Sequence, residues 1–100
     1  MVKHVIVWTL KSEYSDEEKA QIKKGIKEGL EGLKDKVPGI VEIKVYTDGL
    51  ASSNADLILD SAFTDEAALA GYAVHPAHVE VATTMVRPYT AVRSCFDYTV

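Results

Sequence analysis

Segments with a two-residue apolar period alternate along this chain with segments of helical period, and their order restricts the possible folds more than any other feature. Strand patterns occupy residues 2–10, 40–46, 56–63 and 89–100. Helical patterns occupy residues 15–36, 64–72 and 76–86, and a proline separates the last two. With that broken helix counted once, the order predicts an α+β ferredoxin-like fold, a four-stranded antiparallel sheet with helices on one face.

The expected strands carry apolar residues on both of their faces, although the available helices can cover only one face of the sheet. Leu57 and Leu59 alternate with Ile58 in the third strand, and Phe96 and Tyr98 alternate with Cys95 in the last. An apolar sheet face without helices needs another cover. A second copy of the chain is the simplest one, so we expect a homodimer.

Composition narrows the class of protein and its partners. The 100 residues, 47% of them hydrophobic, suit one domain over residues 1–100. A net charge of −4 discourages binding to nucleic acid or to anionic membranes. No apolar run approaches the ~20 residues of a membrane span, and the N-terminus lacks the pattern of a signal peptide. A single cysteine, Cys95, favours a reducing compartment, so we expect a cytoplasmic protein.

Four segments carry a family resemblance. They read KHVIV at residues 3–7, VPGI at 37–40, YAVHPAHV at 72–79 and FDY at 96–98. With these motifs the chain resembles the stress-responsive A/B barrel domain family, the dimeric α/β barrels related to plant olivetolic acid cyclase. The resemblance covers nearly the whole chain and implies a ferredoxin-like subunit whose homodimer closes two sheets into a barrel.

The resemblance also implies candidate catalytic residues. The cyclase uses the tyrosine and the second histidine of a Tyr-x-x-His-Pro-Ala-His segment for aldol cyclisation, and these positions are Tyr72 and His78 here. A further pocket histidine of the cyclase falls where this chain has Leu57, which argues against the same substrate. Polyketide-cyclase-like acid–base chemistry is therefore one expectation for Tyr72 and His78.

The residues alone leave a catalytic and a structural interpretation open. Imidazole exchanges protons near neutral pH and a phenol can hydrogen-bond a developing enolate, so Tyr72 and His78 suit acid–base catalysis. The same residues could instead fill the core, with His75 capping the helix that Pro76 begins. His4 and Trp8 share a strand face, where they either line a pocket with Leu57 and His75 or complete the core.

No metal or cofactor is expected. Three scattered histidines and one cysteine make no complete ligand set, although backbone carbonyls of residues 33–37 could hold magnesium as in plant relatives. Asp56 and Asp60 share a phase with Arg93 and Asp97 of the last strand, and we expect cross-strand pairs of arginine with carboxylate there rather than a catalytic pair of carboxylates. Cys95 has no neighbouring base in the sequence, so we expect it to be buried and unreactive.

Three functions remain after these observations. The first is a small-molecule site for an apolar or aromatic compound between sheet and helices, with cyclase- or lyase-type acid–base chemistry as one form of it. The second is a structural or stress-related homodimer without a ligand. A monooxygenase is a weaker third, because no residue pattern supports that reaction beyond the fold. A cavity bordered by Tyr72 and His78 would favour the first, and close packing the second.

Overall fold

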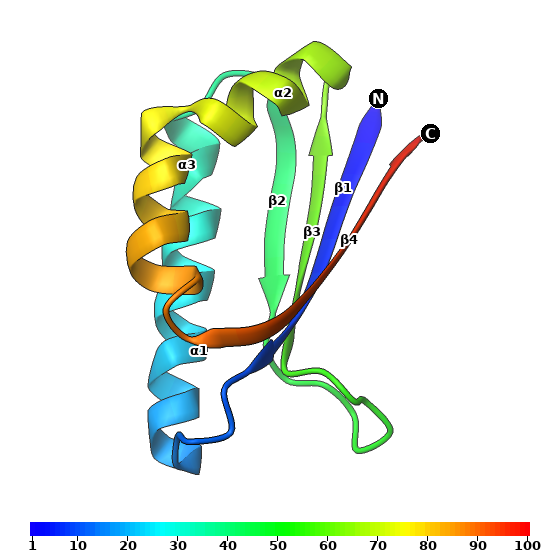
Figure 1. Cartoon of the computed structure of the whole chain (residues 1–100). Coiled ribbons are helices and arrows are strands. Elements are labelled where there is room, and N and C mark those ends of the chain that lie inside the picture. Colours follow the sequence, from blue (N-terminus) through cyan, green and yellow to red (C-terminus); the bar gives the residue numbers. More distant parts are fainter.

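The order of strands and helices in the computed structural model, which describes residues 1–100, is the predicted β-α-β-β-α-α-β. The strands are β1 (Val2–Leu10), β2 (Ile40–Tyr46), β3 (Leu57–Phe63) and β4 (Thr90–Thr99). The helices are α1 (Asp16–Glu31), the short 3-10 helix η1 (Gly32–Asp35), α2 (Glu66–Val74), α3 (Pro76–Val81) and the π-helical turn η2 (Ala82–Val86). Figure 1 shows the helices on one side of the sheet.

The four strands form one antiparallel sheet in the order β2-β3-β1-β4. This order confirms the ferredoxin-like α+β prediction. It places β1 in the middle of the sheet, with β3 on one side and β4 on the other. The two chain ends lie together, and the backbone amide of Val100 donates a hydrogen bond to the Met1 carbonyl at 3.0 Å.

Local sequence signals set the ends of α1. Ser15 accepts a hydrogen bond from the Glu18 amide and the Glu18 carboxylate accepts one from the Ser15 amide, which completes a capping box. The helix was expected to continue to about residue 36, but from Gly32 it tightens into η1. Gly39 follows with a φ of +89°, a conformation that suits glycine and turns the chain into β2.

The break between α2 and α3 lies at His75, as the proline predicts. His75 has extended backbone angles and accepts a hydrogen bond from the Ala77 amide, while Pro76 begins α3. The following turn widens into η2, where the Arg87 amide donates to the Ala82 carbonyl at 2.9 Å. A π turn of this kind rotates the end of the helix relative to its start.

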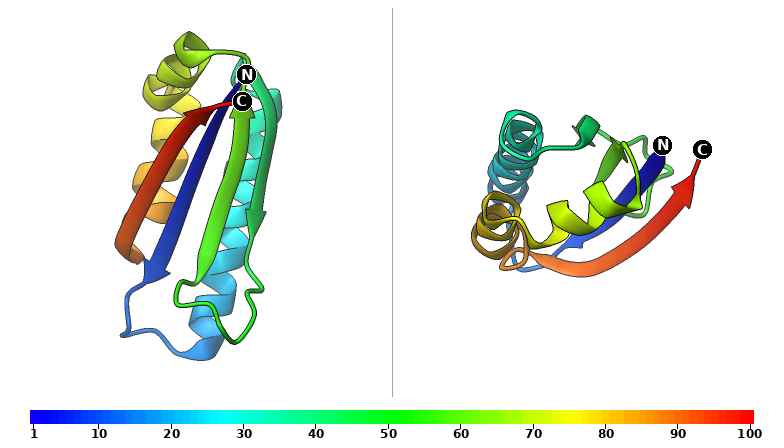
Figure 2. Two further views of the ribbon diagram at one scale, coloured as in Figure 1. Left: turned by 90° about the vertical axis from the view of Figure 1, so that its right-hand side faces the viewer. Right: turned by 90° about the horizontal axis from the view of Figure 1, so that it is seen from above.

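The core lies between the sheet and the helices. Alternate residues of β1 are buried there, among them Ile6 and Trp8, and they pack against Ile26, Leu30 and other apolar residues of α1. The right-hand view of Figure 2 shows that the sheet curves around this layer while its other face carries no helix. None of the helices is both long and apolar enough to cross a bilayer.

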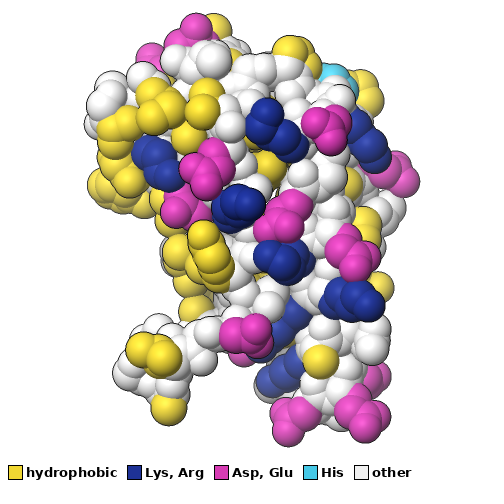
Figure 3. Space-filling model, turned by 180° about the vertical axis from the view of Figure 1, so that it is seen from behind, with side chains coloured by type: hydrophobic (Ala, Val, Ile, Leu, Met, Phe, Trp, Pro, Cys, Tyr) yellow, Lys and Arg dark blue, Asp and Glu magenta, His cyan; other side chains and the backbone are white.

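The face of the sheet without helices, here called the open face, is partly apolar. Val5 pairs with Phe96 in the register of β1 and β4, and Phe96 is 69% exposed. The rings of Phe96 and Tyr98 pack at a tilt of 42°, with 5.8 Å between their centroids. In Figure 3, charged side chains alternate over the α1 side, and hydrophobic ones gather toward the sheet side. Both faces of β4 are exposed in the single chain, as expected of a subunit that needs a partner.

Candidate functional site

A cavity of about 360 Å³ lies between the sheet and the helical layer. Its sheet wall comes from β1, β3 and β4, and its other walls come from α1, α2, α3 and η2. The lining residues are Ile6, Trp8, Leu30, Leu59, Tyr72, His78, Ala82, Val86, Arg87, Thr90 and Arg93. Most of them are apolar, and the polar groups converge from α2, α3, β4 and the turn between η2 and β4. Small-molecule sites in proteins commonly have this composition and size.

A larger hollow of about 640 Å³ lies along the start of α1, between Tyr14 and Tyr89. It is an open surface depression, and its ionisable lining consists of two tyrosines and the exposed Glu17 and Glu18. It contains no buried polar group that a ligand would satisfy. We therefore place the candidate site in the smaller cavity, where buried polar groups meet apolar walls.

Tyr72 is the most buried polar side chain of the cavity lining. It is 1% exposed, and its hydroxyl has no hydrogen-bond partner within the chain. Burial raises the pKa of the Tyr72 phenol well above its ordinary value. The hydroxyl therefore keeps its proton at neutral pH and is a hydrogen-bond donor without an acceptor in the chain.

His78 lies against Tyr72, with 4.2 Å between the ring centroids. Its Nδ1 lies 3.1 Å from the Ala73 carbonyl oxygen, and since a carbonyl can only accept, the proton of the neutral ring belongs on Nδ1. Nε2 then carries the lone pair that could accept a proton. Burial lowers the pKa of His78, and the charges of His4, Arg87 and Arg93 lower it further, whereas the bond to Ala73 opposes them.

The other residues predicted for the site divide between the cavity and its surroundings. Trp8 lines the cavity, and His4 lies behind Tyr72 with 6.2 Å between their ring centroids. His75 lies at the start of α3, where its Nδ1 accepts from the Ala77 amide at 3.1 Å, so it has the predicted capping role. Leu57 is buried in the core but does not line this cavity. The structure thus brings Tyr72, His78 and Trp8 together.

Two predicted contacts of the strand residues are wrong. Asp60 forms an ion pair with Lys3 at 2.6 Å and Asp97 pairs with His4, whereas Asp56 accepts a hydrogen bond from the Leu10 amide. The predicted pairing of arginine with carboxylate between the third and the last strand, which would have joined Asp56 or Asp60 to Arg93, fails because β1 separates β3 from β4. The polar residues of β4 meet β1 instead.

Cys95 is also placed differently from the prediction. It is exposed, and its sulfur lies 3.9 Å from Nδ1 of His4 and 3.5 Å from Oδ1 of Asp97. Partial burial, together with the hydrogen bond and charge of Asp97, raises the pKa of the Cys95 thiol. The thiol is therefore not an activated nucleophile. Sequence reasoning missed this group because His4 lies more than ninety positions from Cys95 and Asp97 and meets them only through the β1–β4 register.

The carbonyl segment considered for magnesium, residues 33–37, is partly used by the fold. The carbonyl of Leu33 accepts hydrogen bonds from the amides of Lys36 and Val37, both at 3.0 Å. These two bonds occupy both lone pairs of that oxygen. The Leu33 carbonyl therefore does not fit a magnesium site.

Solved structures with the same fold support the architecture. The chain is similar to a dimeric protein of unknown function from Bacteroides fragilis, with 29% identity, a TM-score of 0.91 and coverage of 99% of this chain and 95% of that chain. It is also similar to a protein from Arabidopsis thaliana, with 26% identity, a TM-score of 0.76 and coverage of 100% and 95%.

A hydroxynitrile lyase from Passiflora edulis has the same fold, with 20% identity, a TM-score of 0.74 and coverage of 99% of this chain and 87% of that chain. No curated protein matches the chain. The family model described as the stress responsive A/B barrel domain matches residues 2–100. That match spans all four strands and every helix, so the chain belongs to the stress-responsive A/B barrel domain family.

Proposed function

We propose that the protein binds a small apolar or aromatic carbonyl compound in the cavity beside Tyr72 and His78 and catalyses proton transfer on it. The observation that carries this proposal is the buried Tyr72 hydroxyl, which has no partner although it belongs to the cavity lining. A buried hydroxyl without a hydrogen bond costs about 1–3 kcal/mol of stability. A ligand oxygen that accepted from it would offset this cost.

The chemistry follows from the protonation states of the two side chains. Nε2 of His78 takes a proton from the carbon next to the substrate carbonyl, and the Tyr72 hydroxyl donates a hydrogen bond to the carbonyl oxygen as it becomes negative. The lowered pKa of His78 keeps its imidazole neutral and available as a base at neutral pH. Cyclase- and lyase-type reactions both use such a proton transfer, and the fold is shared with a lyase.

The working unit in this proposal is a homodimer that forms through the open face. Its support is the exposed apolar surface around Phe96, together with structures of the same fold that are described as dimeric. We further propose a cytoplasmic location, which the free Cys95 supports because thiols persist in reducing compartments.

Binding can be tested through the single tryptophan of the chain, because Trp8 lines the cavity. Acetophenone and phenylacetone are suitable probes, since each joins an aromatic ring to a carbonyl. We expect saturable changes in Trp8 fluorescence, which should disappear in Ala82→Phe because the larger side chain fills the cavity. An unchanged spectrum with every probe up to millimolar concentrations would contradict a ligand site and favour the purely structural homodimer.

Turnover can be tested separately by proton exchange. In deuterium oxide, a base at Nε2 should replace the hydrogens next to the ketone by deuterium, which NMR detects without any cofactor. His78→Ala should lower the rate by about 10²–10⁴-fold, the usual contribution of one general base, while the fold is retained. If the ketone binds but its hydrogens exchange at the same rate with the wild type, with the variant and in buffer alone, the protein is a binding protein rather than an enzyme.

A further inference from the structure

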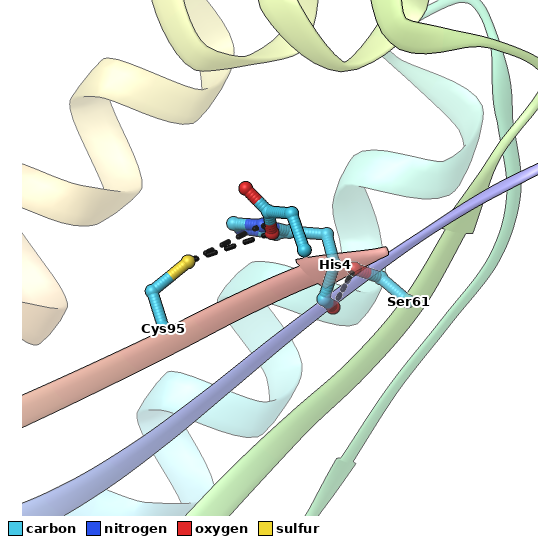
Figure 4. A network of polar contacts seen from close by, with 4 residues as sticks. His4, Ser61 and Cys95 are labelled. Atoms are coloured by element: carbon cyan, nitrogen blue, oxygen red, sulfur yellow. Dashed lines mark hydrogen bonds and ion pairs between the residues drawn. The ribbon is translucent and has the colours of Figure 1, made fainter. Parts of the chain in front are cut away.

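Three side chains with different metal-binding atoms meet on the helix-facing side of the sheet. His4 comes from β1, and Cys95 and Asp97 come from β4, where Asp97 is the register partner of His4. Nδ1 of His4, Sγ of Cys95 and Oδ1 of Asp97 all lie within 4.8 Å of one another. In Figure 4, the labelled His4 and Cys95 side chains point toward the same space above the sheet.

The separations are close to those of ligands that share one tetrahedral zinc ion. Bond lengths of about 2.0–2.3 Å put a sulfur about 3.5 Å from a nitrogen or oxygen ligand, and a nitrogen about 3.3 Å from an oxygen. The sulfur lies 3.5 Å from Oδ1 of Asp97 and 3.9 Å from Nδ1 of His4. The nitrogen and oxygen, 2.5 Å apart, share a hydrogen bond and would separate by less than 1 Å around an ion.

The histidine of this cluster is held in place by its surroundings. His4 is 8% exposed, and its ring meets the rings of Phe63 and Tyr72 edge-on, with 6.2 Å between centroids in both pairs. The Ser61 hydroxyl donates to the backbone carbonyl of His4 at 2.7 Å, which fixes β1 at this position. Cys95 and Asp97 are exposed, so an ion could reach the cluster from solvent.

The same three residue types could suggest a nucleophilic cysteine with a His–Asp pair, but the geometry opposes it. Such a triad needs the cysteine on one ring nitrogen and the carboxylate on the other. Here both Cys95 and Asp97 approach Nδ1 of His4. Three ligand atoms that converge on one point can coordinate a metal ion, but they cannot relay a proton through the imidazole ring.

We propose that His4, Cys95 and Asp97 form a binding site for a divalent transition metal of the zinc class. A thiolate, an imidazole and a carboxylate together favour zinc or cobalt over magnesium or calcium, which prefer oxygen ligands alone. Three protein ligands leave a fourth position for water or another molecule. The proposal does not rest on proton transfer by Tyr72 and His78, and it revises the expectation that the chain binds no metal.

Cobalt is the probe for this site because its absorption reports the ligands. The full-length protein, freed of metal with a chelator and kept reduced with a phosphine, is titrated with Co²⁺. We expect one equivalent per chain, visible bands of a tetrahedral ion and a near-ultraviolet band from thiolate-to-cobalt charge transfer. Zn²⁺ added afterwards should abolish all of these bands.

Two exposed positions supply the variants, so buried His4 can stay unchanged. Cys95→Ser should abolish the charge-transfer band, and Asp97→Asn should weaken binding by more than the roughly 10–100-fold typical of an outer-shell partner. Asp60→Asn is the matched control, because the side chains of Asp60 and Asp97 are 43% and 44% exposed and Asp60 lies on another strand. Circular dichroism checks that each variant is folded.

The proposal is overturned if the wild type shows no charge-transfer band, or if the band survives in Cys95→Ser. It is equally overturned if Asp60→Asn weakens cobalt binding as much as Asp97→Asn does, because binding would then be general surface attraction. None of these outcomes bears on ketone binding in the cavity, which is measured with metal-free protein.

Discussion

At the scale of single residues, loss of the Tyr72 hydroxyl should affect stability and function in opposite directions. Its buried hydroxyl has no partner within the chain, so Tyr72→Phe should raise the free energy of unfolding by about 1 kcal/mol. The same change should weaken ketone binding or slow proton exchange, since the donor to the carbonyl is lost. Urea unfolding and the exchange assay measure the two effects.

Tyr46→Phe is the control for this prediction, because Tyr46 is 57% exposed at the end of β2, away from the cavity. Tyr46→Phe should change neither the free energy of unfolding nor the rate of proton exchange. A loss of stability in Tyr72→Phe would show that the hydroxyl has a partner in the folded protein, and the argument for an awaiting ligand oxygen would fail.

His78 makes a prediction about pH. Its pKa in the folded protein is lowered, chiefly by burial, relative to about 6.5 in the unfolded chain. The unfolded state therefore binds a proton more readily, so the stability linked to His78 is present above pH 6.5 and is lost as the pH falls through the folded pKa. Denaturant midpoints at pH 7.5 and pH 5 should differ less in His78→Gln than in the wild type. If the two midpoints differed equally in the variant and in the wild type, the lowered pKa of His78 would be contradicted.

At the scale of elements, Gly39 controls the turn from η1 into β2. Its φ is +89°, and a Cβ there would lie 2.6 Å from the Cβ of Ala68 in α2. Gly39→Ala should therefore lower the free energy of unfolding by about 2 kcal/mol, from left-handed strain and the close contact together. Urea denaturation measures the change.

Gly71 provides the opposite case within α2. Nothing lies within 4 Å of a Cβ built there, and its backbone is helical. Gly71→Ala should stabilise the protein by about 0.4–1 kcal/mol. If both substitutions changed stability by the same amount in the same direction, the turn at Gly39 would not have the geometry described here.

The elements also show what the sequence could and could not predict. The strands at residues 2–10 and 40–46 were predicted to the residue because their alternating apolar side chains face a packed core. The π turn at residues 82–86 leaves no periodic signal, since it shifts the helix by one residue only. The positions of Tyr72 and His78 came from a family motif rather than from periodicity.

Contacts between strands were the least predictable part of the site. Asp97 pairs with His4 and Cys95 lies beside both because of the register between β1 and β4. Alternation tells which residues share a face of one strand, but it does not tell which residue of another strand lies opposite. The cluster therefore needed the three-dimensional structure.

At the scale of the whole molecule, the open face predicts assembly. Phe96 lies on the open face and is 69% exposed in the single chain. Phe96→Glu would bury a charge in the expected interface, so it should shift the protein from dimer to monomer. Obligate dimer interfaces bury on the order of 2,000 Å² or more, so the wild type should remain dimeric at micromolar concentration. Light scattering at several concentrations measures the mass.

Val74→Glu is the control for assembly, because Val74 is 75% exposed at the end of α2, outside the open face. It should leave the mass and the stability unchanged. The melting temperature of the wild type should rise with protein concentration if folding and association are linked. A monomeric wild type at micromolar concentration would contradict the predicted homodimer.

The strand order also has a consequence in time. β1 is made first, yet it is a central strand whose two neighbours are β3 and β4, and β4 is made last. Pairings across so many residues form slowly, because a long loop must close before any contact compensates for it. During synthesis the apolar side chains of β1 therefore remain exposed to solvent until β3 and β4 pair with it. His4 meets Cys95 and Asp97 only when the last strand has docked, so metal binding would also report that folding is complete.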